Sequence, residues 1–136
     1  MKYFTIQELT ASATAKRKGI DNTPDAKAVA SLTALVANVL DPLREAYGKP
    51  IVVTSGYRCP KLNRAVGGVA RSQHSKGEAA DIRTLSNRRW ENEQLFKLIV
   101  KLKLPFDQLI DEHGYSWIHV SYSEGKNRRQ VLHVKQ

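Results

Sequence analysis

Apolar residues recur at helical spacing in the first third of the chain. One stripe falls every three or four positions, which predicts a helix with one buried face. Its members are Val29, Leu32, Val36, Val39 and Leu43. Thr23 and Pro24 come just before it, as an expected N-cap and first helical residue. Pro42 lacks an N–H group, so we expect the helix to kink or break there.

A second helical pattern and several short apolar runs follow. The helix is expected to start at Ser86, to pack Trp90 inward and to stop near Pro105. A shorter helix is expected over residues 4–9. Runs rich in β-branched and aromatic residues predict strands at 51–54, 79–83, 107–111, 117–122 and 130–134. Residues 55–78 are expected to form a long loop. The fold class is therefore α+β, a small antiparallel sheet flanked by helices.

Residues 117–122 alternate in character. Ile118 and Val120 are expected to face the core, whereas Trp117 and His119 point to the other side of the strand. That side faces a cleft or solvent, and a histidine lies at its centre.

Composition narrows the class of protein. A chain of 136 residues suits one domain over 1–136. No apolar run reaches the roughly 20 residues of a membrane span, and no apolar segment follows Lys2, so we expect cytoplasmic synthesis without a Sec signal. Cys59 is the single cysteine, which excludes an internal disulfide and a four-cysteine zinc site. The net charge of +9 indicates a polyanionic partner: nucleic acid, membrane surface or cell-wall polymer.

Two histidines and one aspartate offer zinc ligands. His74 lies in the long loop, Asp81 in the following strand and His119 on the cleft side of a later strand. Two imidazoles and a carboxylate would leave a position for water. Hydrolysis would also need a base, for which Glu112 is the first candidate, ahead of Asp111 and His113. The spacing alone favours the alternative of an unrelated loop histidine, a strand-end aspartate and a surface histidine.

The motifs around these residues resemble a known family. Residues 72–81 read S-x-H-x-x-G-x-A-x-D, and residues 117–121 read W-x-H-V-S. Both resemble motifs of the zinc D-alanyl-D-alanine carboxypeptidases, whose fold is shared with VanX-type dipeptidases, several phage endolysins and the hedgehog signalling domain. Residues 54–58 (TSGYR), 62–63 (LN) and 106–110 (FDQLI) resemble the small phage and prophage branch. The resemblance extends over essentially the whole chain.

The resemblance implies roles for individual residues. The implied zinc ligands are His74, Asp81 and His119. Arg58 matches an arginine that holds the substrate carbonyl or the developing oxyanion, where a fixed positive charge is favourable; a salt bridge to a nearby carboxylate is the alternative. The implied substrate-binding residues are Ser72, Gln73, Tyr57 and Trp117. Support of His74 is the alternative for Ser72 and Gln73, and simple packing is the alternative for Tyr57 and Trp117.

One position departs from the family pattern. Many relatives place the general base three residues before the last zinc histidine, where this chain has Ser116. Other branches place it at the end of the preceding strand, which Glu112 fits. An ordinary strand-end charge at Glu112 would instead leave a catalytically weak or silent zinc module that binds a wall peptide or a protein partner.

The resemblance implies a zinc peptidase that acts on peptidoglycan stem peptides, as a D,D-carboxypeptidase or endopeptidase of the endolysin kind. We expect the protein to be a monomer. Such an enzyme reaches the wall after lysis or phage-assisted release. Its basic groups would hold it to the anionic wall. No specific nucleic-acid binding is expected, because the sequence contains no recognisable recognition helix, ribonucleoprotein motif or zinc finger.

Overall fold

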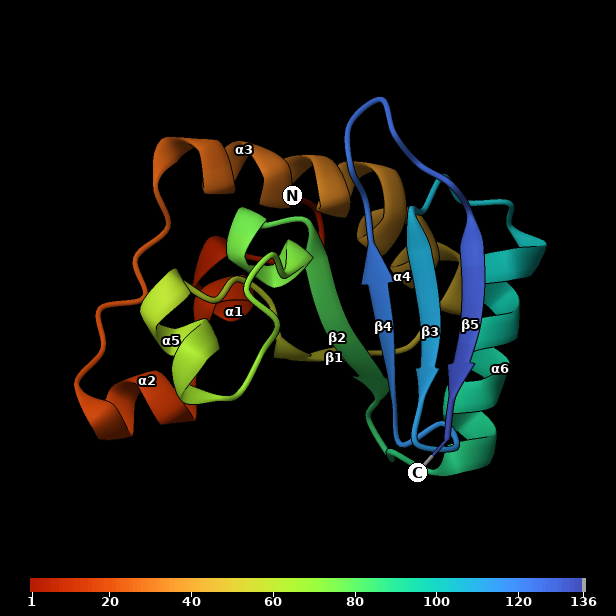
Figure 1. Cartoon of the computed structure of the whole chain (residues 1–136). Helices are drawn as coiled ribbons and strands as arrows, with labels where there is room; N and C mark the ends of the chain where they lie inside the picture. Colours follow the sequence, from red (N-terminus) through yellow and green to blue (C-terminus); the bar gives the residue numbers. More distant parts are fainter. Residues whose placement is uncertain (136) are drawn as a thin grey trace.

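A computed structural model describes residues 1–135, in which helices surround a sheet of short strands (Figure 1). The helices are α1 (Ile6–Thr10), α2 (Ala13–Lys18), α3 (Ala26–Leu35), the π-helical η1 (Val36–Leu40), α4 (Asp41–Tyr47), α5 (Pro60–Ala65), the 3-10 helix η2 (Gln73–Lys76) and α6 (Arg89–Lys101). The strands are β1 (Ile51–Ser55), β2 (Ala79–Thr84), β3 (Gln108–Glu112), β4 (Trp117–Ser121) and β5 (Gln130–Val134).

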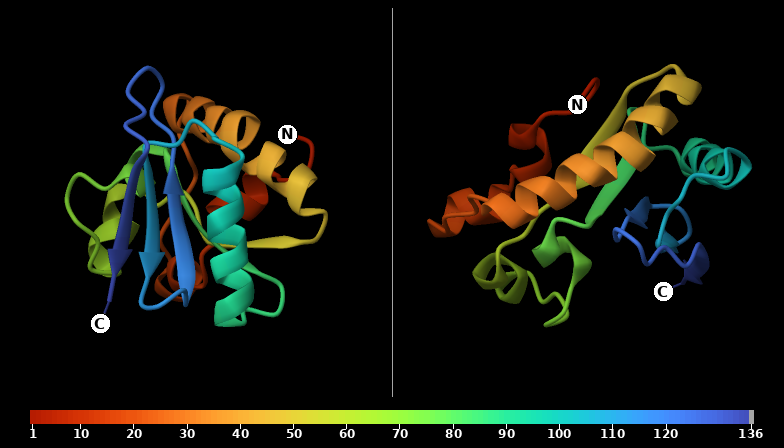
Figure 2. Two further views of the ribbon diagram at one scale, coloured as in Figure 1. Left: turned by 90° about the vertical axis from the view of Figure 1, so that its right-hand side faces the viewer. Right: turned by 90° about the horizontal axis from the view of Figure 1, so that it is seen from above.

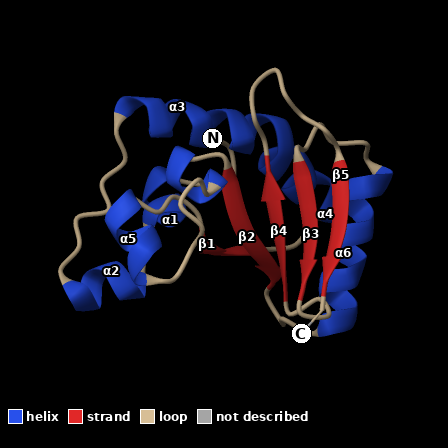
Figure 3. Cartoon of the chain, in the orientation of Figure 1, coloured by secondary structure: helices blue, strands red, loops and turns tan. Residues whose placement is uncertain are grey.

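The strands form one sheet in the order β1-β2-β4-β3-β5. Neighbouring strands are antiparallel except β3 and β5, which are parallel. The chain leaves β4 through a long loop that returns it beside β3, so β5 runs in the same direction as β3 (Figure 3). The predicted α+β class with a largely antiparallel sheet is confirmed.

Helices cover one face of the sheet, and the loop segment between β1 and β2 lies on the other. The left view of Figure 2 shows α6 on one side of the strands and the green segment that contains α5 on the other. Buried side chains of the covered face include Ile82, Ile118 and Val120, which join buried residues of the helices in one apolar cluster. The opposite face carries Asp81, Glu112 and His119 together with Ile110 and Trp117.

Pro42 does not break the long helix. The turn before it widens instead into η1, where the Asp41 N–H group bonds to the Val36 carbonyl five residues earlier. Proline has no N–H group and its ring crowds the preceding turn, so a π turn lets the chain stay helical. Of the expected kink or break, the break is absent, and α4 continues to Tyr47 with the proline in its first turn.

Several local expectations are corrected. Asp25 is the N-cap of α3 and accepts from the Ala28 N–H group at 2.8 Å, so Thr23 and Pro24 lie outside the helix. The expected loop at 55–78 contains α5 and η2. Trp90 is 56% exposed on α6 rather than packed inward. For Trp90 and for the helices within the loop, tertiary contacts override local preference.

One helical stretch of the described residues is long and apolar enough to cross a membrane by length and composition alone. It runs over Ala26–Tyr47, whereas the sequence analysis expects no such segment. Its apolar side chains Leu32, Leu35, Val36 and Val39 are fully buried among the core residues of this fold. A core helix meets the same criteria, so the stretch is weak support for a membrane span.

Asn92 joins three parts of the fold. Its side chain is fully buried on α6. The carboxamide oxygen accepts from the Thr84 N–H group at the end of β2, and the amide group donates to Asn87 and to the Tyr115 carbonyl. One side chain thus pairs backbone groups of two turns that bound the sheet.

Replacing Asn92 should therefore destabilise the protein strongly. Asn92→Ala leaves buried backbone groups without partners, and we expect a loss of about 3 kcal/mol in the free energy of unfolding. Denaturant titration measures this loss, with the exposed Gln94→Ala on the same helix as a control that should change stability by less than about 0.5 kcal/mol. If both variants lowered the free energy of unfolding by the same amount, the hydrogen bonds of Asn92 would make no specific contribution to stability.

Candidate metal centre

Two of the predicted ligands are direct neighbours across strands. The antiparallel pairing of β2 with β4 places Asp81 opposite His119. Side chains opposite each other on one sheet face lie about 5 Å apart at their Cβ atoms. Both project from the face that the long helices leave uncovered, so the sheet register alone brings a carboxylate and an imidazole together.

The third ligand comes from the segment before β2. His74 lies in η2 and is 3% exposed. Ser72 caps this turn by accepting from the His74 N–H group at 3.1 Å. Gly77 ends it with a φ of +74°, and a Cβ there would lie 2.6 Å from the Ala28 carbonyl oxygen of α3. Only glycine permits this conformation and this close approach, which fold η2 back over the sheet.

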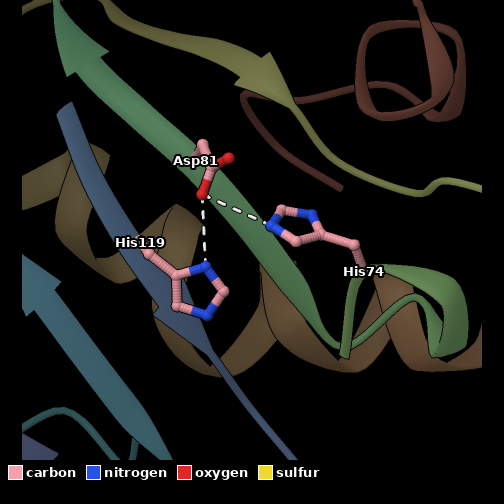
Figure 4. Close-up of side chains that lie close together, drawn as sticks. All are labelled: His74, Asp81 and His119. Atoms are coloured by element: carbon pink, nitrogen blue, oxygen red, sulfur yellow. Dashed lines mark hydrogen bonds and ion pairs between the residues drawn. The ribbon is translucent and has the colours of Figure 1, made fainter. Parts of the chain in front are cut away.

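The three side chains converge on one point (Figure 4). Asp81 Oδ1 lies 3.4 Å from His74 Nε2 and 3.2 Å from His119 Nδ1. All three ligand atoms lie within 4.8 Å of one another. Around a tetrahedral zinc ion with bonds of about 2.0–2.2 Å, neighbouring donor atoms are about 3.4 Å apart. The donor set and its spacing therefore fit zinc.

The orientation of His74 is fixed by its other ring nitrogen. Nδ1 lies 2.7 Å from the Gly56 carbonyl oxygen, a distance at which the ring N–H group donates. This bond leaves Nε2 as the lone-pair nitrogen that faces Asp81, the arrangement found in most histidine ligands. Gly56 is itself required, because a Cβ there would lie 2.1 Å from the Leu9 carbonyl oxygen.

Asp81 is held as a carboxylate. Burial by itself raises its pKa, but the contacts with His119 and His74 outweigh burial and keep the pKa well below its usual range. An ionised carboxylate between two imidazoles is the form that binds a metal cation.

The group opens onto a cleft of about 1060 Å³. Arg58 lines this cleft, and its backbone N–H group donates to the His74 carbonyl at 3.1 Å. Its Nε is buried without a hydrogen-bond partner among residues 1–135, and burial lowers the pKa of its guanidinium. The described residues form no salt bridge to Arg58, although the negative charge of Asp81 partly offsets the effect of burial on its pKa.

Glu112 also lines the cleft, from the end of β3. Burial raises the pKa of its carboxyl group above the ordinary value. Asp111 lies on the opposite face of the strand, where it accepts from the Tyr115 N–H group and contacts His133 at 3.2 Å. His113 packs its ring against Trp117, with centroids 5.0 Å apart. Of the three candidate bases, Glu112 is the one that lines the cleft.

The predicted substrate-binding residues divide. Trp117 and Gln73 line the cleft. Ser72 also lines the cleft, but its hydroxyl caps η2. This fits the alternative role given above, in which Ser72 supports His74. Tyr57 is 7% exposed and belongs to the apolar core, which fits the packing alternative rather than a contact with substrate.

Two further residues of the cleft are absent from the predicted site. Asp107 and Arg128 form an ion pair whose shortest distance is 2.8 Å, between a carboxylate oxygen and Arg128 Nε. They lie 21 positions apart in segments that only the folded sheet brings together. In the sequence, the feature that points to this pair is the motif at residues 106–110, which contains Asp107.

Comparison with known proteins agrees with this geometry. No curated protein matches the chain. The sequence does match the Peptidase M15 family, over residues 2–121. Members of this family are zinc metallopeptidases, which accounts for a group of two histidines and one aspartate at the head of a cleft. The chain belongs to the Peptidase M15 family of zinc D-alanyl-D-alanine carboxypeptidases and their relatives.

Proposed function

We propose that this protein hydrolyses stem peptides of peptidoglycan, as a D,D-carboxypeptidase or endopeptidase that acts like a phage or prophage endolysin on the wall after lysis. The observation that carries the proposal is the convergence of His74, Asp81 and His119 at zinc spacing in a cleft that Glu112 also lines. A structural zinc site would be closed by a fourth protein ligand, whereas this one opens to a space of peptide size.

Bound zinc would supply a Lewis acid that polarises the scissile carbonyl and acidifies a water molecule. Glu112 accepts a proton from the attacking water and later donates it to the leaving amine. Its raised pKa suits both steps, since burial brings the carboxyl closer to the working pH.

Arg58 provides the second charge of the site. Its guanidinium is half-buried in the cleft wall and unpaired by any carboxylate of the described residues. A cation that is already fixed in place stabilises negative charge that grows on the carbonyl oxygen. Arg58 therefore holds the developing oxyanion while Glu112 handles the proton.

Removal of the base should abolish hydrolysis without removing the metal. We expect Glu112→Gln to lower kcat at least a hundredfold, because the glutamine cannot accept the proton, while zinc content stays that of the wild type. Mass spectrometry of muropeptides incubated with the purified zinc-loaded protein measures the products and identifies the bond that is cut.

Glu93→Gln, a matched change on α6, serves as the control and should leave the products unchanged. If Glu112→Gln formed hydrolysis products at the wild-type rate, Glu112 would be excluded as the general base. Muropeptide binding by wild-type protein without any product would instead support the catalytically silent zinc module.

A basic surface on α6 supports attachment to the wall. Its exposed cations are Arg88, Arg89, Lys97 and Lys101. They lie on the helix that covers the sheet face opposite the cleft, so they can bind an anionic polymer without blocking the site (Figure 2). The exposed Trp90 adds an aromatic surface beside them.

Neutralising these four residues to glutamine should weaken binding to isolated cell walls, most at low salt where charge attraction is least screened. Sedimentation with walls measures binding, and release of product from a small soluble peptide measures the active site. Binding that falls several-fold while peptide cleavage is kept would match the proposal. An equal loss of both activities would contradict a separate wall-binding surface.

A further inference from the structure

A buried carboxylate connects two walls of the cleft. Asp107 is 3% exposed and precedes β3. Its carboxylate accepts from the Arg128 backbone N–H group at 3.1 Å, from Arg128 Nε at 2.8 Å and from Arg128 Nη2 at 3.0 Å. It also accepts from Gln73 Nε2 at 2.9 Å. The carboxylate is thus saturated by two segments far apart in sequence.

These bonds fix Arg128 in one orientation. Asp107 engages Nε and Nη2, which is the paired geometry that holds a guanidinium plane most firmly. Nη1 has no partner among residues 1–135, and the Arg128 side chain is 60% exposed where it lines the cleft. A guanidinium held along one edge retains donors on its other edge for a second carboxylate.

The Asp107 carboxylate also fixes the position of Arg128 relative to the metal centre. Gln73, which shares Asp107, is the residue next to His74 in η2. The Arg128 guanidinium therefore lies at a set place relative to the zinc ligands, although its loop follows β4.

The charges of the cleft favour an anionic ligand at that place. Arg71, Lys76 and Lys126 also line it, and none forms a salt bridge among the described residues. Four carboxylates line the cleft against five Arg and Lys side chains, so the cations are in excess by one. Asp81 faces the two histidines, Asp107 is already saturated, Glu112 is the proposed base, and Glu78 accepts from Ser123 Oγ at 3.3 Å. A peptide with a carboxylate beyond its scissile bond would meet complementary charge.

We propose that Arg128 binds a substrate carboxylate separate from the scissile amide, and that Asp107 is the positioning residue that holds it there. The cleft then selects acidic peptides over their amidated forms. This inference rests on the proposed peptidase function and adds to it the charge of the preferred substrate.

The test uses two stem pentapeptides that differ only in a free or amidated α-carboxylate on glutamate. Wild-type enzyme loaded with zinc should cleave the free acid with a kcat/KM about tenfold higher, mainly through KM, as expected for one charge-assisted contact. Arg128→Gln should bring this ratio close to one. Arg129→Gln is the matched control, because that guanidinium stacks on Phe106 and should leave the ratio at its wild-type value.

Asp107→Asn tests the positioning role. It should lower the ratio while Arg128 is still present, and Asp107→Glu should restore part of it, which a general loss of stability would not do. Arg128→Lys keeps the charge without the paired geometry and should give an intermediate ratio.

An unchanged ratio in Arg128→Gln, or an equal fall in Arg129→Gln, would overturn the inference while the peptidase function stands. If wild-type enzyme cleaves neither peptide, the proposed function fails. Calorimetric binding of the same two peptides to zinc-loaded protein then decides the inference: a tighter free acid whose advantage needs Arg128 supports it, and equal affinities overturn it.

Discussion

The register between β2 and β4 is the constraint on which the site depends. It sets Asp81 directly opposite His119, on the sheet face that the long helices leave uncovered. Because side chains alternate along a strand, a slip of one residue would turn the aspartate toward the core and bring Ala80 or Ile82 into its place. Burial of Ile82 and Ile118 on the other face opposes that slip, so the apolar core and the metal centre are specified by the same pairing.

The third ligand makes the helices part of the active centre. His74 is oriented by the Gly56 carbonyl, and Gly56 lies against the backbone of Leu9 in α1. Gly77, which closes the turn that carries His74, lies close to the backbone of Ala28 in α3. Helices remote from the cleft thus set the position of a metal ligand through close backbone contacts. Changes in their packing should reach the site without any direct contact with substrate.

Periodicity and motifs predicted much of this molecule, and the failures have more than one origin. Alternation in the last strands placed His119 on a cleft side correctly, since that pattern reflects burial directly. The N-cap of α3 was predicted at Thr23 but is Asp25, because several polar residues there can cap equally well by type. The contact between Asp107 and Arg128 could not be read from the sequence, since it depends on where a long loop returns.

The account stands on one zinc ion held by His74, Asp81 and His119. X-ray absorption at the zinc edge, on protein with one equivalent of zinc, tests this most directly. We predict two imidazole nitrogens and light oxygen donors at about 2.0–2.2 Å, with a spectrum that changes in His119→Ala and stays the same in His133→Ala. A sulfur ligand at about 2.3 Å from Cys59, or a spectrum unaffected by His119→Ala, would contradict the account.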